Sequence, residues 1–280
     1  MKLSLITNDV RVAQKAEEAG VERILIDLER AGKAARQAGR SLFLSTHQME
    51  DVRRIKLALG RTEIAVRVDP LHSGTREQID LAVAYGADLI VLPFFQRLEE
   101  AAEFVALLQK RAAAVLLVET ASAAVALGEL CRLPGVAEIH IGLNDLSISL
   151  GLPSWFELLT GSVLEKLCAT LRASTIPFGF GGIACLSRLD LPINPELVLA
   201  EQVCQGATRG WLSRTFREVA LPALAEEVQQ VRKAIAFWNS AGVRERAQMR
   251  VLLSEDIESA RQSCMNATIR ERALQNVQEH

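Results

Sequence analysis

The sequence is poor in features that mark several protein classes. Its five cysteines are scattered without a CxxC pair, and an odd number of cysteines does not form a disulfide framework. No apolar run reaches the roughly eighteen residues of a membrane span, and the N-terminal MKLSLITNDV turns polar too soon for a signal peptide. We therefore expect a cytoplasmic protein without a membrane partner, in which the cysteines fill the core.

Neither sign of charge dominates. The chain has 32 Lys and Arg against 34 Asp and Glu, for a net charge of −2, which argues against nucleic acid as a partner. Any anion site must therefore be local. With 280 residues and 49% hydrophobic content, the chain can bury the core of one large α/β domain with an appendage.

Eight short apolar segments alternate with segments of helical length over residues 1–220. Several of these segments are almost continuously apolar, as expected for parallel strands that are buried on both faces. Eight such repeats favour a (β/α)8 TIM barrel. A doubly wound open sheet is the alternative, although no GxGxxG follows the first segment. The eight segments are LSLIT (3–7), RILIDLE (23–29), EIAVRVD (63–69), LIVLP (89–93), VLLVE (115–119), IHIGL (139–143), IPFGFG (176–181) and RGWLSR (209–214).

The character of the sequence changes after Pro222. Residues 223–280 contain no proline and one glycine, and their apolar residues recur at helical spacing. We therefore divide the chain into a barrel core, residues 1–222, and a helical extension, residues 223–280. The extension begins with the eighth barrel helix, at about 223–240, and a further helix after Gly242 is surplus to a barrel. Surplus amphipathic helices commonly pack on a partner subunit, so we expect a homo-oligomer.

Polar residues gather where the predicted strands end. In a barrel, catalytic groups come from the carboxyl ends of the strands, so this is the expected place for a site. These residues are Asp27 and Glu29, Arg67 and Asp69, Glu119, Asn144 and Asp145, Gly181 and Gly182, and Ser213 and Arg214.

Glu119 and Asp145 each end an apolar segment and precede a predicted helix. They are 26 residues apart, one βα repeat, so adjacent strands would place them side by side. Two carboxylates with water suit a hard divalent cation, which polarises a carbonyl oxygen and stabilises an enolate. We predict that both bind such a metal ion. Asp145 could also cap the helix that follows, and a helix N-terminus there could face a substrate carboxylate.

Arg67 is a cation within an apolar strand, so it needs anions beside it. Asp27 and Glu29 are two residues apart and would point to one face of their strand. Either they form a structural ion pair with Arg67, or Arg67 holds a carboxylate or the oxygen of a nascent enolate, and the two roles are compatible. We predict a site role for Glu29, directly or through water on a metal ion, and one for Asp27, with proton transfer as one option.

Three further features are candidates near the mouth of the barrel. Gly181 and Gly182 in FGFGGI bring backbone without a Cβ atom to the place where a ligand would approach. His47, which follows the apolar run SLFLST (41–46), could reach the mouth as a general base or could be merely solvated. The basic residues Arg30, Lys33, Arg36 and Arg40 form either a solvated face or an anion site.

The segments IDLER, VRVDP, GADLIVLP, LLVET and HIGLNDLS resemble, in this order, one enzyme family over about residues 20–215. This family joins metal-dependent pyruvate aldolases of the hydroxy-oxo-heptanedioate type with citrate lyase β subunits and malyl-CoA lyases. The resemblance implies a phosphoenolpyruvate/pyruvate-type barrel in which Glu119 and Asp145 bind Mg²⁺ or Mn²⁺. It also implies that Arg67 stabilises the enolate oxygen, that amides near Asn144 and Asp145 hold the oxo-acid carboxylate, and that oligomers, trimers or hexamers, join through C-terminal helices.

One position departs from the family. Its pyruvate aldolases carry a histidine directly after the strand-two glutamate, and its lyases carry an aspartate, but this chain has Arg30. We expect Arg30 to bind an extra acid group on the substrate, and the general base is unassigned. The predicted activity is cleavage or formation of a carbon–carbon bond through the enolate of pyruvate or a related oxo acid. The alternatives are a lyase or synthase for coenzyme A esters and a non-catalytic homologue that binds metal and oxo acid.

Overall fold

The computed structural model describes residues 1–32 and 45–278, with side chains as far as Ser263. Residues 41–44 of SLFLST and the basic residues Lys33, Arg36 and Arg40 lie outside the described part of the chain. No helix within that part is both long enough and apolar enough to cross a membrane.

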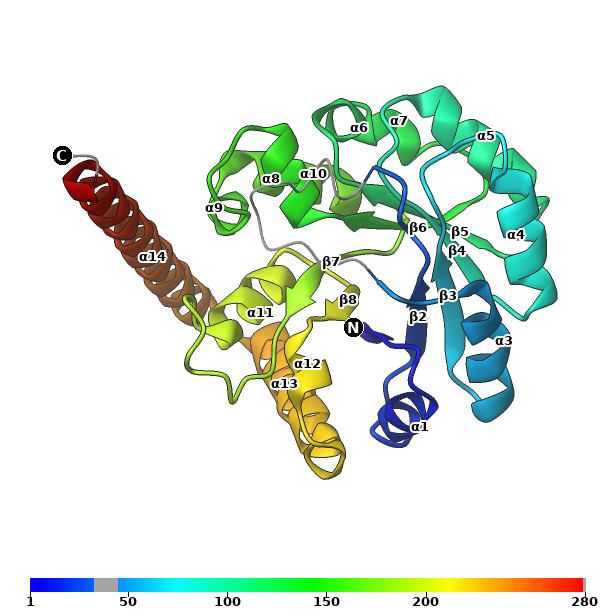
Figure 1. Cartoon of the computed structure of the whole chain (residues 1–280), viewed down its shortest axis with the longest axis horizontal. Helices are drawn as coiled ribbons and strands as arrows, with labels where there is room; N and C mark the ends of the chain where they lie inside the picture. The colour runs from blue at the N-terminus through cyan, green and yellow to red at the C-terminus, as the bar shows by residue number, and fades with distance from the viewer. Residues whose placement is uncertain (33–44, 279–280) are drawn as a thin grey trace.

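Eight parallel strands form a closed barrel in sequence order, and β8 pairs with β1 (Figure 1). This confirms the (β/α)8 barrel and excludes the open sheet. The strands are β1 Lys2–Ile6, β2 Arg23–Asp27, β3 Glu63–Arg67, β4 Leu89–Leu92, β5 Ala113–Val118, β6 Val136–Ile141, β7 Phe178–Ile183 and β8 Arg209–Leu212.

Helices follow the strands and surround the barrel. Several begin at side chains that accept their first amide N–H groups, such as Asp9 before α1 and Asn194 before α11. The helices are α1 Val10–Glu18, α3 Met49–Ala58, α4 Thr75–Ala84, α5 Leu98–Leu108, α6 Ala121–Val125, α7 Leu127–Leu130, α8 Leu143–Ser149, α9 Phe156–Leu159, α10 Ser162–Ala173, α11 Pro195–Cys204, α12 Thr215–Glu218, the 3₁₀ helix η1 Leu221–Ala223, α13 Leu224–Ser240 and α14 Val243–Gln278.

The barrel interior is layered by the two-residue period of its strands. At the amino-terminal end, Arg23 of β2 pairs with Glu138 of β6 and Glu63 of β3. Above this ionic layer, the interior is filled by an apolar cluster of Leu25, Ala65, Leu89, Val91, Val115, Leu117 and Trp211. Because side chains two residues apart share a face, β2, β3 and β5 place Asp27, Arg67 and Glu119 in the next layer, at the carboxyl-terminal end.

The C-terminal helices differ in their packing. The apolar stripe of α13 is buried, which matches the helix predicted at 223–240, and α13 packs against α11 and α1. The first part of α14 packs on α11 through Met249, Leu253 and Ile257, and the rest extends away from the barrel (Figure 1). Val251 and Leu252 of α14 are exposed.

Candidate active site

A cavity of about 510 Å³ opens at the carboxyl-terminal end of the barrel. Its walls come from the ends of the strands and from the loops that follow them, with Trp155 contributed by the segment between α8 and α9. Nine of the residues singled out from the sequence line it: Asp27, Arg67, Glu119, Asn144, Asp145, Gly181, Gly182, Ser213 and Arg214.

Arg67 is held by two carboxylates. The strand register sets Asp27 of β2 opposite Arg67 of β3. The guanidinium of Arg67 donates two hydrogen bonds to the Asp27 carboxylate, from Nε to Oδ1 at 2.8 Å and from Nη2 to Oδ2 at 2.6 Å. Nη1 lies 3.4 Å from Oε2 of Glu29, which is fully buried. Burial opposes the charged form of Arg67, but Asp27 and Glu29 outweigh it and raise the pKa, so Arg67 is a permanent cation. A structural ion pair and a substrate-binding role for Arg67 therefore remain compatible, because the ion pair holds a charged guanidinium at the cavity wall.

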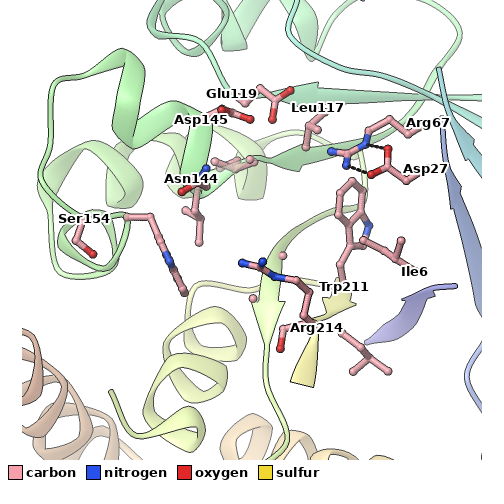
Figure 2. Close-up of a pocket in the computed structure, with 18 of the residues that line it drawn as sticks. Ile6, Asp27, Arg67, Leu117, Glu119, Asn144, Asp145, Ser154, Trp211 and Arg214 are labelled. Atoms are coloured by element: carbon pink, nitrogen blue, oxygen red, sulfur yellow. Dashed lines mark hydrogen bonds and ion pairs between the residues drawn. The ribbon is translucent and has the colours of Figure 1, made fainter. Parts of the chain in front are cut away.

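Glu119 and Asp145 lie side by side on the far side of the cavity from Trp211 (Figure 2). Glu119 directly follows β5, and its Oε1 accepts the backbone N–H of Phe94 at 2.9 Å. Phe94 has a φ of 44°, in the left-handed region that non-glycine residues seldom adopt. The loop after β4 is therefore bent so that it positions the Glu119 carboxylate.

Negative charge is crowded around Glu119. Burial raises the pKa of Glu119 well above its ordinary value, and the neighbouring charges of Glu29 and Asp145 raise it further, whereas Arg67 lowers it. A divalent cation would relieve this repulsion. Among the described residues no group of three or more His, Cys, Asp or Glu side chains is arranged as a metal site. The pair Glu119 and Asp145 nevertheless fits Mg²⁺ or Mn²⁺, since Mg²⁺ is commonly held by one or two carboxylates together with water and substrate oxygens.

Two glycines shape the cavity. A Cβ atom on Gly142, between β6 and α8, would lie 2.6 Å from Cβ of Glu119, so a side chain there would displace the carboxylate. Gly182 has a φ of 93°, and a Cβ atom there would lie 3.1 Å from the ring of Trp155. The prediction that FGFGGI brings bare backbone to the ligand space is consistent with Gly181 and Gly182 both lining the cavity.

His47 lies behind the site, not at its mouth. It is buried, and its Nδ1 accepts the backbone N–H of Asp27 at 3.0 Å. Burial, together with the charge of Arg217, lowers the pKa of His47 to about 4, so the ring is neutral at pH 7. The solvated alternative for His47 is therefore wrong, and His47 is absent from the cavity lining.

Arg30 also lies outside the cavity lining. Its side chain is exposed, and Nη2 donates to the carbonyl oxygen of His47 at 2.8 Å. The backbone N–H groups of Arg30 and Ala31 donate to Asp69 Oδ1, so Asp69 orders this turn after β2. Arg30 thus supports the loop that carries His47, and the described lining of the cavity includes no histidine.

Sequence reasoning missed Trp155, Trp211 and Arg217, all of which line the cavity. Trp211 stacks on His140, with ring centroids 4.8 Å apart, and its ring lies 5.9 Å from the guanidinium carbon of Arg67. Trp211 could have been found from the sequence, because side chains two residues apart on a strand share a face, and Trp211 therefore shares the face of Ser213 at the end of β8. Trp155 lies in a loop and Arg217 in a short helix, so no periodic pattern pointed to either.

Comparison with known proteins agrees with this architecture. Residues 3–178 match the family model of the HpcH/HpaI aldolase/citrate lyase proteins. No curated protein sequence matches the chain.

Solved structures share the fold at low sequence identity. A HpcH/HpaI aldolase/citrate lyase family protein from Burkholderia cenocepacia J2315 is 19% identical, with a TM-score of 0.60 over 82% of this chain and 94% of that chain. An HpcH/HpaI aldolase from Desulfitobacterium hafniense DCB-2 is 15% identical, with a TM-score of 0.57 over 84% and 92%. The citrate synthase SbnG is 16% identical, with a TM-score of 0.58 over 83% and 94%. These structures support the fold, and the family match spans more than half of the sequence: the chain belongs to the HpcH/HpaI aldolase/citrate lyase family.

Proposed function

We propose that the protein is a divalent-metal-dependent carbon–carbon lyase that acts through the enolate of pyruvate or a related 2-oxo acid. One observation carries the proposal: a permanently charged Arg67 and the carboxylate pair of Glu119 and Asp145 line the same cavity. Family membership supports an aldolase or lyase activity in general.

In this proposal, different side chains and backbone amides of the cavity have different roles. Glu119 and Asp145 would hold Mg²⁺ or Mn²⁺, which when bound supplies Lewis-acid polarisation of the 2-oxo group. Arg67, fixed by Asp27 and Glu29, stabilises the negative charge that develops on the 2-oxo oxygen as the carbon–carbon bond breaks. Backbone amides at Asn144 and Asp145, in the first turn of α8, bind the oxo-acid carboxylate. Trp155 and Trp211 provide apolar walls that limit water around the enolate.

Deuterium exchange into the methyl group of pyruvate tests this function without knowledge of the acceptor. In D₂O with Mg²⁺ or Mn²⁺, NMR should show enzyme-dependent exchange, because enolate formation alone exchanges these protons. Glu119→Gln and Arg67→Met should each slow exchange by about 10²- to 10³-fold, the usual effect of removing one oxyanion-stabilising group.

Arg261→Gln is a matched control, since Arg261 is an exposed arginine on α14 that pairs with Glu258. Exchange that persists at full rate after chelation of the metal, or in Glu119→Gln, would contradict the proposed function. Binding of pyruvate without any exchange would favour the non-catalytic homologue.

A further inference from the structure

One titratable side chain of the barrel interior has no part in the proposed function. His140 of β6 is 1% exposed, and neither of its ring nitrogens has a hydrogen-bond partner among the described residues. Burial lowers the pKa of His140, Glu138 opposes that shift, and the charge of Arg23 adds to it, so the ring is neutral. A buried imidazole without hydrogen bonds costs stability, and its place in the core therefore needs an explanation.

The ring of His140 contacts both layers of the interior. Its Nε2 lies 3.7 Å from Oε2 of Glu138, a carboxylate that is bound by Arg23 and Arg209 of the ionic layer. One face of the ring stacks on Trp211 of the apolar cluster, with the centroids 4.8 Å apart and the planes inclined by 29°. The imidazole thus connects the ionic layer to the indole above it.

Strand β7 leaves room for this stack. It lies between the strands that carry His140 and Trp211, and Gly179 of β7 is the register partner of His140. Gly181, two residues further on, shares the inward face of Gly179. A Cβ atom on Gly181 would lie 4.0 Å from Cε3 of Trp211, so the indole lies against backbone without a side chain. The glycines of FGFGGI therefore provide space for the two rings.

Trp211 in turn contacts the cation on which the proposed chemistry depends. Its ring centroid lies 5.9 Å from the guanidinium carbon of Arg67, within the range of a cation–π interaction. Figure 2 shows the indole beside the ion pair of Arg67 and Asp27. Trp211 is part of the described cavity lining, and His140 is not. A continuous stack therefore runs from the ionic layer through His140 and Trp211 to Arg67.

We propose that His140 is a positioning residue of the active site: it supports the indole of Trp211, which keeps Arg67 in place beside the enolate oxygen. This inference rests on the proposed function for the role of Arg67. Asp27 and Glu29 hold the guanidinium through ion pairs, and the indole restricts its movement and its hydration. Removal of the imidazole leaves a void into which the indole can move, so His140 affects catalysis without contact with the substrate.

Pyruvate methyl exchange in variants of His140 tests the proposal. His140→Ala should lower the exchange rate at saturating pyruvate by about tenfold, while KM for pyruvate stays within about twofold, because the groups that bind the carboxylate are unchanged. His140→Phe should keep most of the rate, since a flat ring still supports the indole. The matched control is Ile139→Ala, because Ile139 is a fully buried neighbour that packs in the main core outside the barrel interior. It should lose stability but not exchange.

A double substitution shows whether His140 acts through Trp211. In a Trp211→Ala background, His140→Ala should cause no further loss of exchange, because the indole that it supports is already absent. A further loss of about tenfold in this background, native exchange in His140→Ala alone, or an equal loss in Ile139→Ala would each overturn the proposal.

Fluorine NMR separates this inference from the proposed function. The chain has three tryptophans, so labelling with 5-fluorotryptophan gives three signals, and Trp211→Phe identifies the signal of Trp211. In metal-free protein without pyruvate, His140→Ala should shift and broaden this signal and leave the other two in place. His140→Phe should keep it sharp, and Ile139→Ala should leave it as in the native protein. This result would support the proposed contact even if the native protein shows no pyruvate exchange, whereas an unchanged Trp211 signal in His140→Ala would overturn it.

Discussion

At the scale of single residues, the site depends on two side chains outside the described cavity lining, those of His47 and Glu29. His47 accepts the backbone N–H of Asp27, Asp27 holds Arg67, and Glu29 lies behind the same guanidinium. A neutral His47 is needed for this chain of contacts, because a protonated Nδ1 could not accept the Asp27 N–H. The charge state of one buried ring is therefore tied to the position of the arginine in the cavity.

The pKa of His47 predicts a pH-dependent stability. The folded-state pKa is about 4 against an ordinary value of 6.5, so between these pH values the unfolded chain binds a proton that the folded chain does not. Stability should fall as pH falls from 6.5 to 4, with up to about 3 kcal/mol of that loss due to His47. Urea unfolding across this range checks it, and His47→Gln should flatten the dependence. Parallel pH curves for the two proteins would argue against a neutral buried His47.

Residues differ in how far the sequence could predict them. Glu119, Asp145 and Arg67 could be found because a charge that ends or interrupts a buried strand is readable from the chain alone. The burial of His47 could not be predicted, since it depends on the contact of its ring with the backbone of Asp27, which lies 20 residues earlier in the sequence. Arg217 lines the cavity through its contact with Ile6, which is 211 residues away in the sequence. Such contacts leave no local pattern.

At the scale of elements, the junction of β6 and α8 determines the position of the Glu119 carboxylate, which follows the neighbouring strand β5. Gly142→Ala should push the Glu119 carboxylate away, because the new Cβ would lie 2.6 Å from Cβ of Glu119. We expect pyruvate exchange to fall by about tenfold or more, in line with the sensitivity of catalysis to small misplacements. Gly128→Ala in α7 is the control, since its new Cβ would meet nothing closer than 3.9 Å. Native exchange rates in Gly142→Ala would show that Glu119 is not needed at this position.

The ionic layer at the opposite end of the barrel joins five strands, β1, β2, β3, β6 and β8. Arg23 is 2% exposed and donates to both carboxylate oxygens of Glu138, at 2.8 and 3.0 Å. Arg23→Met should destabilise the protein by about 3 kcal/mol, because it leaves Glu138 buried with less compensation. Lys2→Met should cost about 1 kcal/mol or less, since the ion pair of Lys2 with Glu63 is partly exposed. Urea unfolding of both variants checks the contrast, and equal losses would contradict it.

At the scale of the whole molecule, the barrel was predictable because every strand is short and apolar and is followed by a helix. The packing of α14 was less predictable from the sequence than the barrel was. Its apolar residues form a broken stripe, and the structure buries Met249, Leu253 and Ile257 against the barrel side while leaving Val251 and Leu252 exposed. One helix thus combines a face that docks on its own barrel with apolar residues that face solvent, and the sequence alone did not separate the two.

The exposed face of α14 leads to a prediction about assembly. Val251 and Leu252 are 57% and 43% exposed, and this helix extends away from the barrel (Figure 1). We expect a trimer or hexamer that joins through this helix, since exposed apolar residues on a long helix are typical of subunit contacts. Light scattering after size exclusion should show a lower mass for the double variant Val251→Glu, Leu252→Glu. The matched control is Leu57→Glu on α3, where the leucine is 78% exposed but lies on a barrel helix. If the control dissociates and the double variant does not, the subunits meet through the barrel and not through α14.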